Sequence, residues 1–317
     1  MKLLVTGALG HIGSRLIHDM KPGEFDEVVL LDDFSVQRYC SLFNLPAGVP
    51  FRFIEADVCK ADMGRIVEGM DVVIHLAAIT NAAGSFEIQD QVERVNFEGT
   101  RLVARACAAA GARMVFLSTT SVYGTQTDVV DEGCAIDGLK PQSPYADSKL
   151  KAEQTLAALG RDEGLRFVTC RFGTIFGTSV GMRFHTAVNK FCWQAVLGQP
   201  ITVWRTALHQ RRPYLELGDA VRALRFIVRT DRFDREIYNV LTLNATVQDI
   251  VEAIREFVPD VQSEFVDTKI MNQLSYAVST EKFAQLGFSY AGDLRAGIGA
   301  TIGLLQGLRR TAGVGAT

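Results

Sequence analysis

Short apolar runs alternate with helix-like segments through the first half of the chain. Six runs of strand length lie at 2–6, 28–31, 51–54, 72–76, 114–117 and 167–170. Between them, apolar residues recur at helical spacing, as over 88–110 and 146–159. Strands that alternate with helices form βαβ units, and nearly continuous apolar strands are typical of a parallel sheet covered on both faces. The pattern therefore predicts an α/β fold with a doubly wound parallel sheet.

After about residue 173 the pattern loosens and indicates a smaller α/β domain. We expect helices at 182–197, 219–229, 246–258 and 280–286, and a strand at 238–241. Because these segments interleave, each domain is predicted to contain two stretches of chain. Residues 1–175 and 214–242 would form the sheet domain, and residues 176–213 and 243–310 the smaller domain.

Composition excludes several classes of protein. The 317 residues carry a net charge of −3, which gives no reason to expect nucleic acid or a membrane surface as a partner. No apolar run reaches membrane-helix length, and the first residues do not read as a signal peptide, so we expect a cytoplasmic protein. No cysteine pair has Cys-x-x-Cys spacing and the histidines do not cluster with carboxylates, which predicts free thiols and no metal site.

A glycine-rich segment, Gly7-Ala8-Leu9-Gly10-His11-Ile12-Gly13, follows the first predicted strand and opens a helix. Glycines there permit a tight turn and close approach of the backbone to a pyrophosphate, and the helix N-terminus supplies free N–H groups. A single glycine motif is weak evidence, but its position between strand and helix is the context that a dinucleotide site requires. The segment therefore predicts a dinucleotide site.

Acidic residues follow the next two strands. Asp32 ends the second strand, 19 residues after Gly13, where a carboxylate can bind the ribose hydroxyls and would repel a 2′-phosphate. Asp33 can share this role. Asp57, followed by Val58, suits a position near the adenine, although an ordinary loop aspartate fits the sequence as well. The cofactor predicted from this spacing is NAD rather than NADP.

Tyr145 and Lys149 lie one helical turn apart, so both side chains share a face of their predicted helix. A tyrosine, with a pKa of about 10, becomes a useful base only when a nearby cation stabilises its phenolate, and Lys149 can supply that charge. Ser118, Thr119 and Thr120 come at the end of the fifth strand, where a hydroxyl can bind a reacting sugar oxygen. The pair alone is common by chance, so its meaning depends on these neighbours.

Taken in order, the motifs resemble the extended short-chain dehydrogenases/reductases with their Rossmann-type sheet. The motifs are Gly7-x-x-Gly10-x-x-Gly13, Leu76-Ala77-Ala78, Asn96-x-x-Gly99-Thr100, Ser118-Thr119-x-x-Val122-Tyr123-Gly124, Ser143-Pro144-Tyr145-x-x-x-Lys149, Arg171-Phe172-Gly173-x-x-Phe176-Gly177 and Arg212-Pro213-Tyr214-Leu215-x-x-x-Asp219. Within that superfamily they are most similar to the NAD-dependent epimerase/dehydratase family, whose best-known members are UDP-galactose 4-epimerases. The resemblance spans about residues 1–290.

The resemblance implies a role for each matching residue. Tyr145 would be the base, Lys149 its partner and a ligand of the nicotinamide ribose, and Thr119 the residue that binds the substrate hydroxyl. The first domain would bind NAD and the smaller domain a nucleotide-diphosphate sugar, in a protein that we expect to be a homodimer. Further cofactor contacts are expected at Leu76, Ala77, Ala78 and Asn96, and substrate contacts at Thr120, Thr174, Asn189 and Arg212.

The sequence departs from the family at several of these positions. Thr174 replaces the usual asparagine and Thr80 replaces the lysine of the 4-epimerases, so we expect an altered substrate pocket. Arg211 leaves the arginine assignment uncertain by one residue, and Asn189 also fits an ordinary helix-surface position.

The two residues that follow Thr119 in the chain bear on the type of reaction. Thr120 and Ser121 occupy the positions where dehydratases carry Asp-Glu and where decarboxylases keep the Glu, which argues against both reactions unless another acid, such as Glu87, replaces them.

The expected function is that of an NAD-dependent nucleotide-sugar epimerase. A hydride would pass to the nicotinamide and return to the other face of the sugar, with no net oxidation. One alternative is a keto-sugar reductase or dehydrogenase, which would share every catalytic residue but consume cofactor. A second alternative, from another class, is a non-catalytic dinucleotide sensor or scaffold; the intact Thr119, Tyr145 and Lys149 argue against it.

Overall fold

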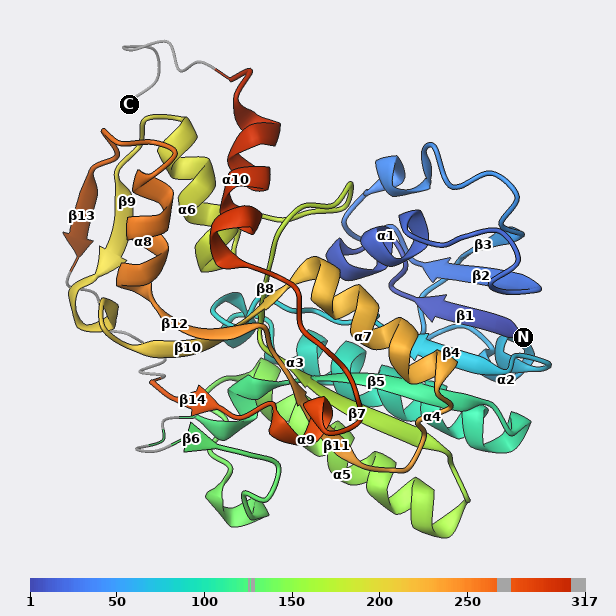
Figure 1. Cartoon of the computed structure of the whole chain (residues 1–317). Helices are drawn as coiled ribbons and strands as arrows, with labels where there is room; N and C mark the ends of the chain where they lie inside the picture. The colour runs from blue at the N-terminus through green and yellow to red at the C-terminus, as the bar shows by residue number, and fades with distance from the viewer. Residues whose placement is uncertain (125, 127–128, 267–274, 309–317) are drawn as a thin grey trace.

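The computed structural model describes residues 1–124, 126, 129–266 and 275–308. Within these residues, seven parallel strands form the central sheet, in the order β11-β7-β5-β4-β1-β2-β3 (Figure 1). The strands are β1 (Lys2–Thr6), β2 (Glu27–Asp32), β3 (Phe51–Glu55), β4 (Val72–His75), β5 (Arg113–Thr119), β7 (Phe167–Phe172) and β11 (Ile237–Val240). Every strand expected from the apolar runs is present, and the predicted Rossmann-type α/β fold is confirmed.

Helices cover both faces of this sheet. Alternate residues of a strand point to opposite faces, so Leu3 and Val5 pack in one hydrophobic core while Leu4 packs in the other. One core also contains residues of α1 (His11–His18), α7 (Leu217–Arg229) and α9 (Glu281–Ala284). The other contains residues of α2 (Met63–Val67), α4 (Gly99–Ala110) and α5 (Pro144–Asp162). Burial on both faces explains why the strands are almost wholly apolar.

A smaller group of elements lies beside the carboxyl ends of the central strands (Figure 1). Strands β8 (Thr174–Phe176), β10 (Arg211–Glu216) and β12 (Leu243–Thr246) form a mixed sheet, in which β10 runs parallel to β8 and antiparallel to β12. Helices α6 (Ala187–Val196), α8 (Val247–Arg255) and α10 (Leu294–Leu305) share a separate hydrophobic core with it. The remaining pairs are β9 (Ile201–Trp204) with β13 (Ser263–Val266) and β6 (Val129–Val130) with β14 (Ala277–Val278).

Two of the three predicted domain boundaries fall inside strands. The boundary after residue 175 divides β8, and the boundary before residue 214 divides β10. These strands therefore join the two parts, and the division into domains stays a prediction. No helix in the described part of the chain combines the length and apolar character needed to span a bilayer.

Two helices differ from their expected form. The segment expected as one helix over 88–110 is α3 (Gln89–Val92), a π-helical stretch (Glu93–Glu98) and α4 in succession. The helix expected at 182–197 begins only at Ala187, because residues 178–186 extend across the glycine-rich segment instead. Helical spacing of apolar residues cannot reveal either change.

Short 3-10 turns lie at Tyr39–Leu42, Gly84–Phe86, Thr120–Tyr123, Ile136–Gly138 and Arg205–Ala207.

Two glycines of α10 provide a matched test of packing in the smaller part. A Cβ atom at Gly297 would lie 2.6 Å from Cε2 of Phe176, whereas a Cβ atom at Gly303 would meet nothing within 4 Å. We predict that Gly297→Ala lowers the free energy of unfolding by about 1–3 kcal/mol. Gly303→Ala should raise it by up to about 1 kcal/mol, since alanine restricts the unfolded chain. Urea unfolding measures both, and equal effects would contradict this packing.

Candidate active site

A cleft opens at the carboxyl ends of the central strands, where parallel α/β sheets bind their ligands. The predicted residues that line it are Gly7, Gly10, His11, Ile12, Gly13, Asp32, Asp33, Asp57, Val58, Leu76, Ala77, Ala78, Thr119, Tyr145, Lys149, Thr174 and Arg212. They come from segments as far apart as the first strand and β10. The structure therefore assembles most of the residues expected from the motifs into a single cleft.

The glycine-rich segment owes its path to close backbone contacts. Gly7 has φ +64°, and a Cβ atom there would lie 2.6 Å from the backbone nitrogen of Ala77. A Cβ atom at Gly13 would lie 2.5 Å from the carbonyl oxygen of Ala8. Any side chain would therefore push α1 away from β1 or the segment away from β4. The N-terminus of α1, with no side-chain cap on Gly10, consequently faces the cleft with free N–H groups, which fits a pyrophosphate.

Carboxylates mark the end of the cleft near β2 and β3. Asp32 accepts hydrogen bonds from the backbone nitrogens of Leu9 (3.0 Å) and Phe34 (3.1 Å), and burial raises its pKa. Its position fits the expected contact with the adenosine ribose. Asp57 is committed to an ion pair with Arg94 at 3.2 Å, which competes with the expected role near the adenine. Nowhere in the described residues do three His, Cys, Asp or Glu side chains converge as metal ligands would.

Asn96 does not line the cleft, contrary to the expected direct cofactor contact. Its fully buried amide forms two hydrogen bonds with the backbone of Ile79, each 2.8 Å long, one to the N–H and one to the carbonyl. The contact shapes the segment after β4, whose residues do line the cleft. Asn96 thus supports the cofactor site indirectly, from a π-helical turn that the sequence pattern did not predict.

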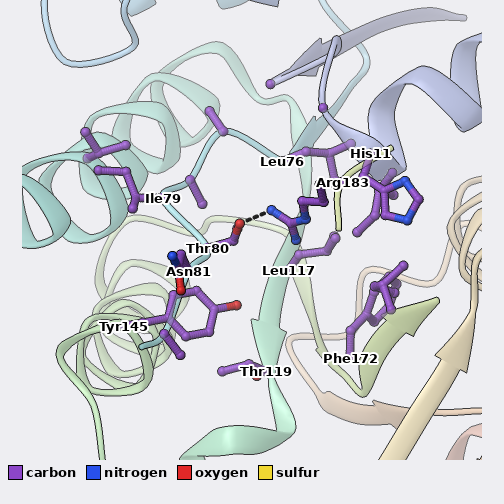
Figure 2. A pocket seen from close by; sticks show the side chains of 18 of the residues that line it. His11, Leu76, Ile79, Thr80, Asn81, Leu117, Thr119, Tyr145, Phe172 and Arg183 are labelled. Atoms are coloured by element: carbon purple, nitrogen blue, oxygen red, sulfur yellow. Dashed lines mark hydrogen bonds between the residues drawn. The ribbon is translucent and has the colours of Figure 1, made fainter. Parts of the chain in front are cut away.

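Helix α5 places the predicted catalytic pair. Its first turn is fixed by Ser143, whose hydroxyl accepts a hydrogen bond from the Ala146 nitrogen at 3.2 Å. Lys149 is only 3% exposed, and its ammonium nitrogen lies 4.9 Å from the ring centroid of Phe116 on β5. The Thr119 side chain acts on the Tyr145 phenol and opposes the rise of its pKa. Figure 2 shows the side chains of Tyr145 and Thr119 next to one another, as an acid–base role for Tyr145 requires.

The electrostatic surroundings of Tyr145 differ from the expectation. Burial raises its pKa, and the charge that opposes this rise comes from Arg183 rather than from Lys149. Burial also lowers the pKa of Lys149 to about 8, with Glu153 acting in the opposite direction. The spacing correctly placed Tyr145 and Lys149 on one helix, but it could not show that an arginine more than 30 residues further along the chain acts on the phenol.

A buried ion pair lies below the catalytic helix. Glu153, one turn beyond Lys149, accepts two hydrogen bonds from Arg171 on β7, at 3.0 Å and 2.7 Å. Both side chains are almost wholly buried, and Ser118 on β5 also donates to Glu153. A bidentate pair of this kind is geometrically specific. It fixes α5 against the two strands that carry the rest of the site.

The four further expected substrate positions differ in their relation to the cleft. Thr174 and Arg212 line the cleft and Arg211 does not, so the geometry favours Arg212 as the expected arginine. Thr120 lies outside the cleft lining, because its hydroxyl turns away and donates to the Phe172 carbonyl at 3.3 Å. Asn189 is also outside, fully buried, with its amide bonded to the backbone of Gly177 and Arg183. The hydrogen bonds of Thr120 and Asn189 thus hold both side chains to backbone groups, and their expected substrate contacts stay predictions.

Several lining residues were not assigned by the sequence motifs. Ser121 lines the cleft and Thr120 does not, and Arg183, Trp204 and Tyr276 line it as well. No spacing rule could find them, because only the tertiary structure brings these segments to the cleft. For Ser121 alone the sequence held a signal, since it occupies one of the two positions that are acidic in dehydratases.

The parallel sheet, the glycine segment before α1 and the Tyr145–Lys149 helix together define an extended short-chain dehydrogenase/reductase fold. Residues 3–240 match the model of the NAD dependent epimerase/dehydratase family, and the chain belongs to this family. The resemblance drawn from the motifs is thereby confirmed.

Individual relatives in the family catalyse different reactions. The chain is 30% identical to a dTDP-glucose 4,6-dehydratase of Streptomyces griseus over 95% of its own length and 92% of that protein. It is 29% identical to a trifunctional UDP-glucose 4,6-dehydratase/3,5-epimerase/4-reductase (RHM1) of Arabidopsis thaliana over 90% of its length, but spans only 44% of that relative. A UDP-glucuronic acid 4-epimerase of Bacillus cereus, solved with NAD, superposes with a TM-score of 0.84 at 25% identity, covering 96% of this chain and 99% of the other.

Burial of Lys149 yields a test of stability against pH. Because its pKa is lowered from 10.5 to about 8 in the folded protein, the unfolded chain binds more protons between these values. Burial of the charged Lys149 therefore lowers the free energy of unfolding, with its full effect below pH 8. This destabilisation disappears as the pH rises from about 8 to 10.5. We predict that Lys149→Met unfolds at higher urea than the parent protein at pH 7, with an advantage that shrinks toward pH 10.

The exposed Lys151 on the same helix, changed to Met, is the control and should show no such pH-dependent gain. A Lys149→Met variant that is less stable than the parent at pH 7 would contradict the assigned cost of burial.

Proposed function

We propose that the protein is an NAD-dependent epimerase of nucleotide-diphosphate sugars. The observation that carries this proposal is the chemistry of the cleft wall around Tyr145. Among the described residues, the carboxylates that line the cleft are Asp32, Asp33 and Asp57, all near the ends of β2 and β3. Thr119 acts on the Tyr145 phenol, Ser121 is bonded to Thr119, and Thr174 contributes another hydroxyl group to the cleft lining. The Tyr145 phenol and these hydroxyl groups suit the removal and return of a proton from a sugar hydroxyl.

Water elimination or decarboxylation places further demands on a site. Elimination needs an acid for the leaving hydroxyl and a base for the neighbouring carbon, and carboxyl groups suit these tasks because burial tunes their pKa. Glu87, the acid considered as a replacement, is exposed and does not line the cleft. We therefore infer that this chain lacks the elimination step named for its dehydratase relatives.

The chain's own residues divide the epimerase reaction between them. Thr119 binds the sugar hydroxyl and directs it toward Tyr145, which accepts the proton and later returns it. NAD held in the cleft would supply a reversible hydride acceptor, so that no net oxidation would result. Arg212, lining the cleft on β10, holds the diphosphate of the sugar nucleotide through a charge-assisted contact. A homodimeric, cytoplasmic protein remains our expectation.

Product analysis tests the reaction type. The enzyme is incubated with UDP- and dTDP-hexoses and with UDP-glucuronate, and products are examined by mass spectrometry and NMR. An isomer of unchanged mass, formed without net change in NADH absorbance, is the expected result. Loss of water or carbon dioxide at a catalytic rate, or stoichiometric consumption of NADH, would instead identify a dehydratase, a decarboxylase or a reductase.

The role of Tyr145 has its own test. Tyr145→Phe keeps the buried ring but removes the proton acceptor, so we predict a loss of turnover of about 10²–10⁴-fold. Affinity for NAD and the melting temperature should stay near those of the parent protein, which calorimetry and thermal unfolding measure. Near-parental turnover in the folded variant would refute the assignment.

A further inference from the structure

The segment of residues 178–186, called the strap below, joins β8 to α6 and crosses the glycine-rich segment. The Thr178 carbonyl accepts a hydrogen bond from Arg15 at 3.2 Å, and the Ser179 hydroxyl lies 2.8 Å from Nδ1 of His11. The backbone nitrogen of Gly181 donates to the Ser14 hydroxyl at 3.0 Å. The strap is therefore fixed to α1 and to the segment that precedes it.

Close packing makes this path specific. A Cβ atom at Gly181 would lie only 2.4 Å from the carbonyl oxygen of Leu9, so that any side chain there would lift the strap from the glycine segment. The strap consequently brings three of its side chains, Arg183, His185 and Thr186, into the wall of the cleft.

Arg183 is the strap residue with an unexplained environment. Its guanidinium reaches Thr80 in the segment after β4, and Figure 2 shows it between His11 and Tyr145. The Nε atom is buried and has no hydrogen-bond partner. Among the described residues, no carboxylate forms an ion pair with Arg183. The nearby Tyr145 acts on Arg183 with the opposite sign only as a phenolate, and burial raises the pKa of that phenol.

The neighbours of Arg183 add positive rather than negative charge. Arg38, at the end of the segment after β2, also lines the cleft and acts on Arg183 with like charge. Burial, followed by the charge of Arg183, lowers the pKa of His11 to about 3, so this ring is neutral, and its Nε2 atom is buried without a partner. A buried guanidinium without a counter-ion is costly. The cluster beside the N-terminus of α1 therefore calls for an anion from a ligand.

We propose that Arg183 binds the pyrophosphate of NAD, beside the backbone N–H groups at the N-terminus of α1. The N-terminus of α1 and the guanidinium of Arg183 then hold the same anion. The glycine-rich segment before α1 belongs to the dinucleotide motif, whereas the strap that carries Arg183 does not. The strap thereby couples cofactor binding to the part of the molecule that carries Arg212. A second diphosphate, that of the sugar nucleotide, offers the same chemistry, and the experiment separates the two.

Isothermal calorimetry on the nucleotide-stripped full-length protein compares NAD, ADP-ribose, adenosine and UDP. Arg183→Gln should weaken NAD and ADP-ribose by the same factor of about 10–100, because both contain the pyrophosphate and a charge-assisted hydrogen bond is lost. Adenosine affinity should stay unchanged. Arg161→Gln, at an exposed arginine of α5 outside the cleft, is the matched control and should leave every affinity unchanged.

Two outcomes would overturn the proposal. If NAD binding weakens but ADP-ribose binding does not, Arg183 acts on the nicotinamide half; if only UDP binding weakens, Arg183 serves the sugar nucleotide. Thermal unfolding without nucleotide checks that each variant is folded. Should Arg183→Gln not fold, Arg183→Lys is judged by the same criterion, since it keeps the charge but loses the planar, two-pronged geometry. The result does not depend on which sugar reaction the enzyme performs.

Discussion

Close approach of backbone to backbone at the glycine-rich segment is the constraint on which the rest of the site depends. Gly7 leaves room for the backbone of Ala77, and Gly13 leaves room for the carbonyl of Ala8. These contacts align the start of α1 with the ends of β1 and β4. The strap uses the same device at Gly181, against the Leu9 carbonyl. With side chains at these positions, the N-terminus of α1 and the strap could not both reach the cleft.

Charge is divided along the cleft in a way that matches the parts of its ligands. Carboxylates gather at the ends of β2 and β3, where Asp32 also fixes the glycine segment through the Leu9 nitrogen. Arg38 and Arg183 lie near the start of α1 and Arg212 lies on β10, while Thr119 and Ser121 contribute hydroxyl groups on the side of Tyr145. Ribose hydroxyls, phosphates and a reacting sugar alcohol require these three environments in turn. The overall charge of −3 gives no hint of this division.

Helix α5 carries a buried lysine that destabilises the fold and an ion pair that fixes the helix in place. Lys149 is a buried ammonium whose pKa is lowered to about 8 by burial, a condition that a stable fold alone would not favour. The bidentate pair of Glu153 and Arg171 anchors the next turn of the same helix. Precise placement of Tyr145 and Lys149 relative to β5 therefore rests on groups that need not touch a ligand.

The sequence by itself determined the parallel sheet, the glycine segment and the Tyr145–Lys149 helix, because each depends on local periodicity or on spacing within one element. Tertiary structure alone decided which side chains reach the cleft. Asn96 and Thr120 turn toward backbone groups, since buried amides and hydroxyls must be hydrogen-bonded. Arg183 enters the cleft because an expected helical turn gives way to the strap. Such choices depend on contacts between distant segments, which spacing along the chain does not encode.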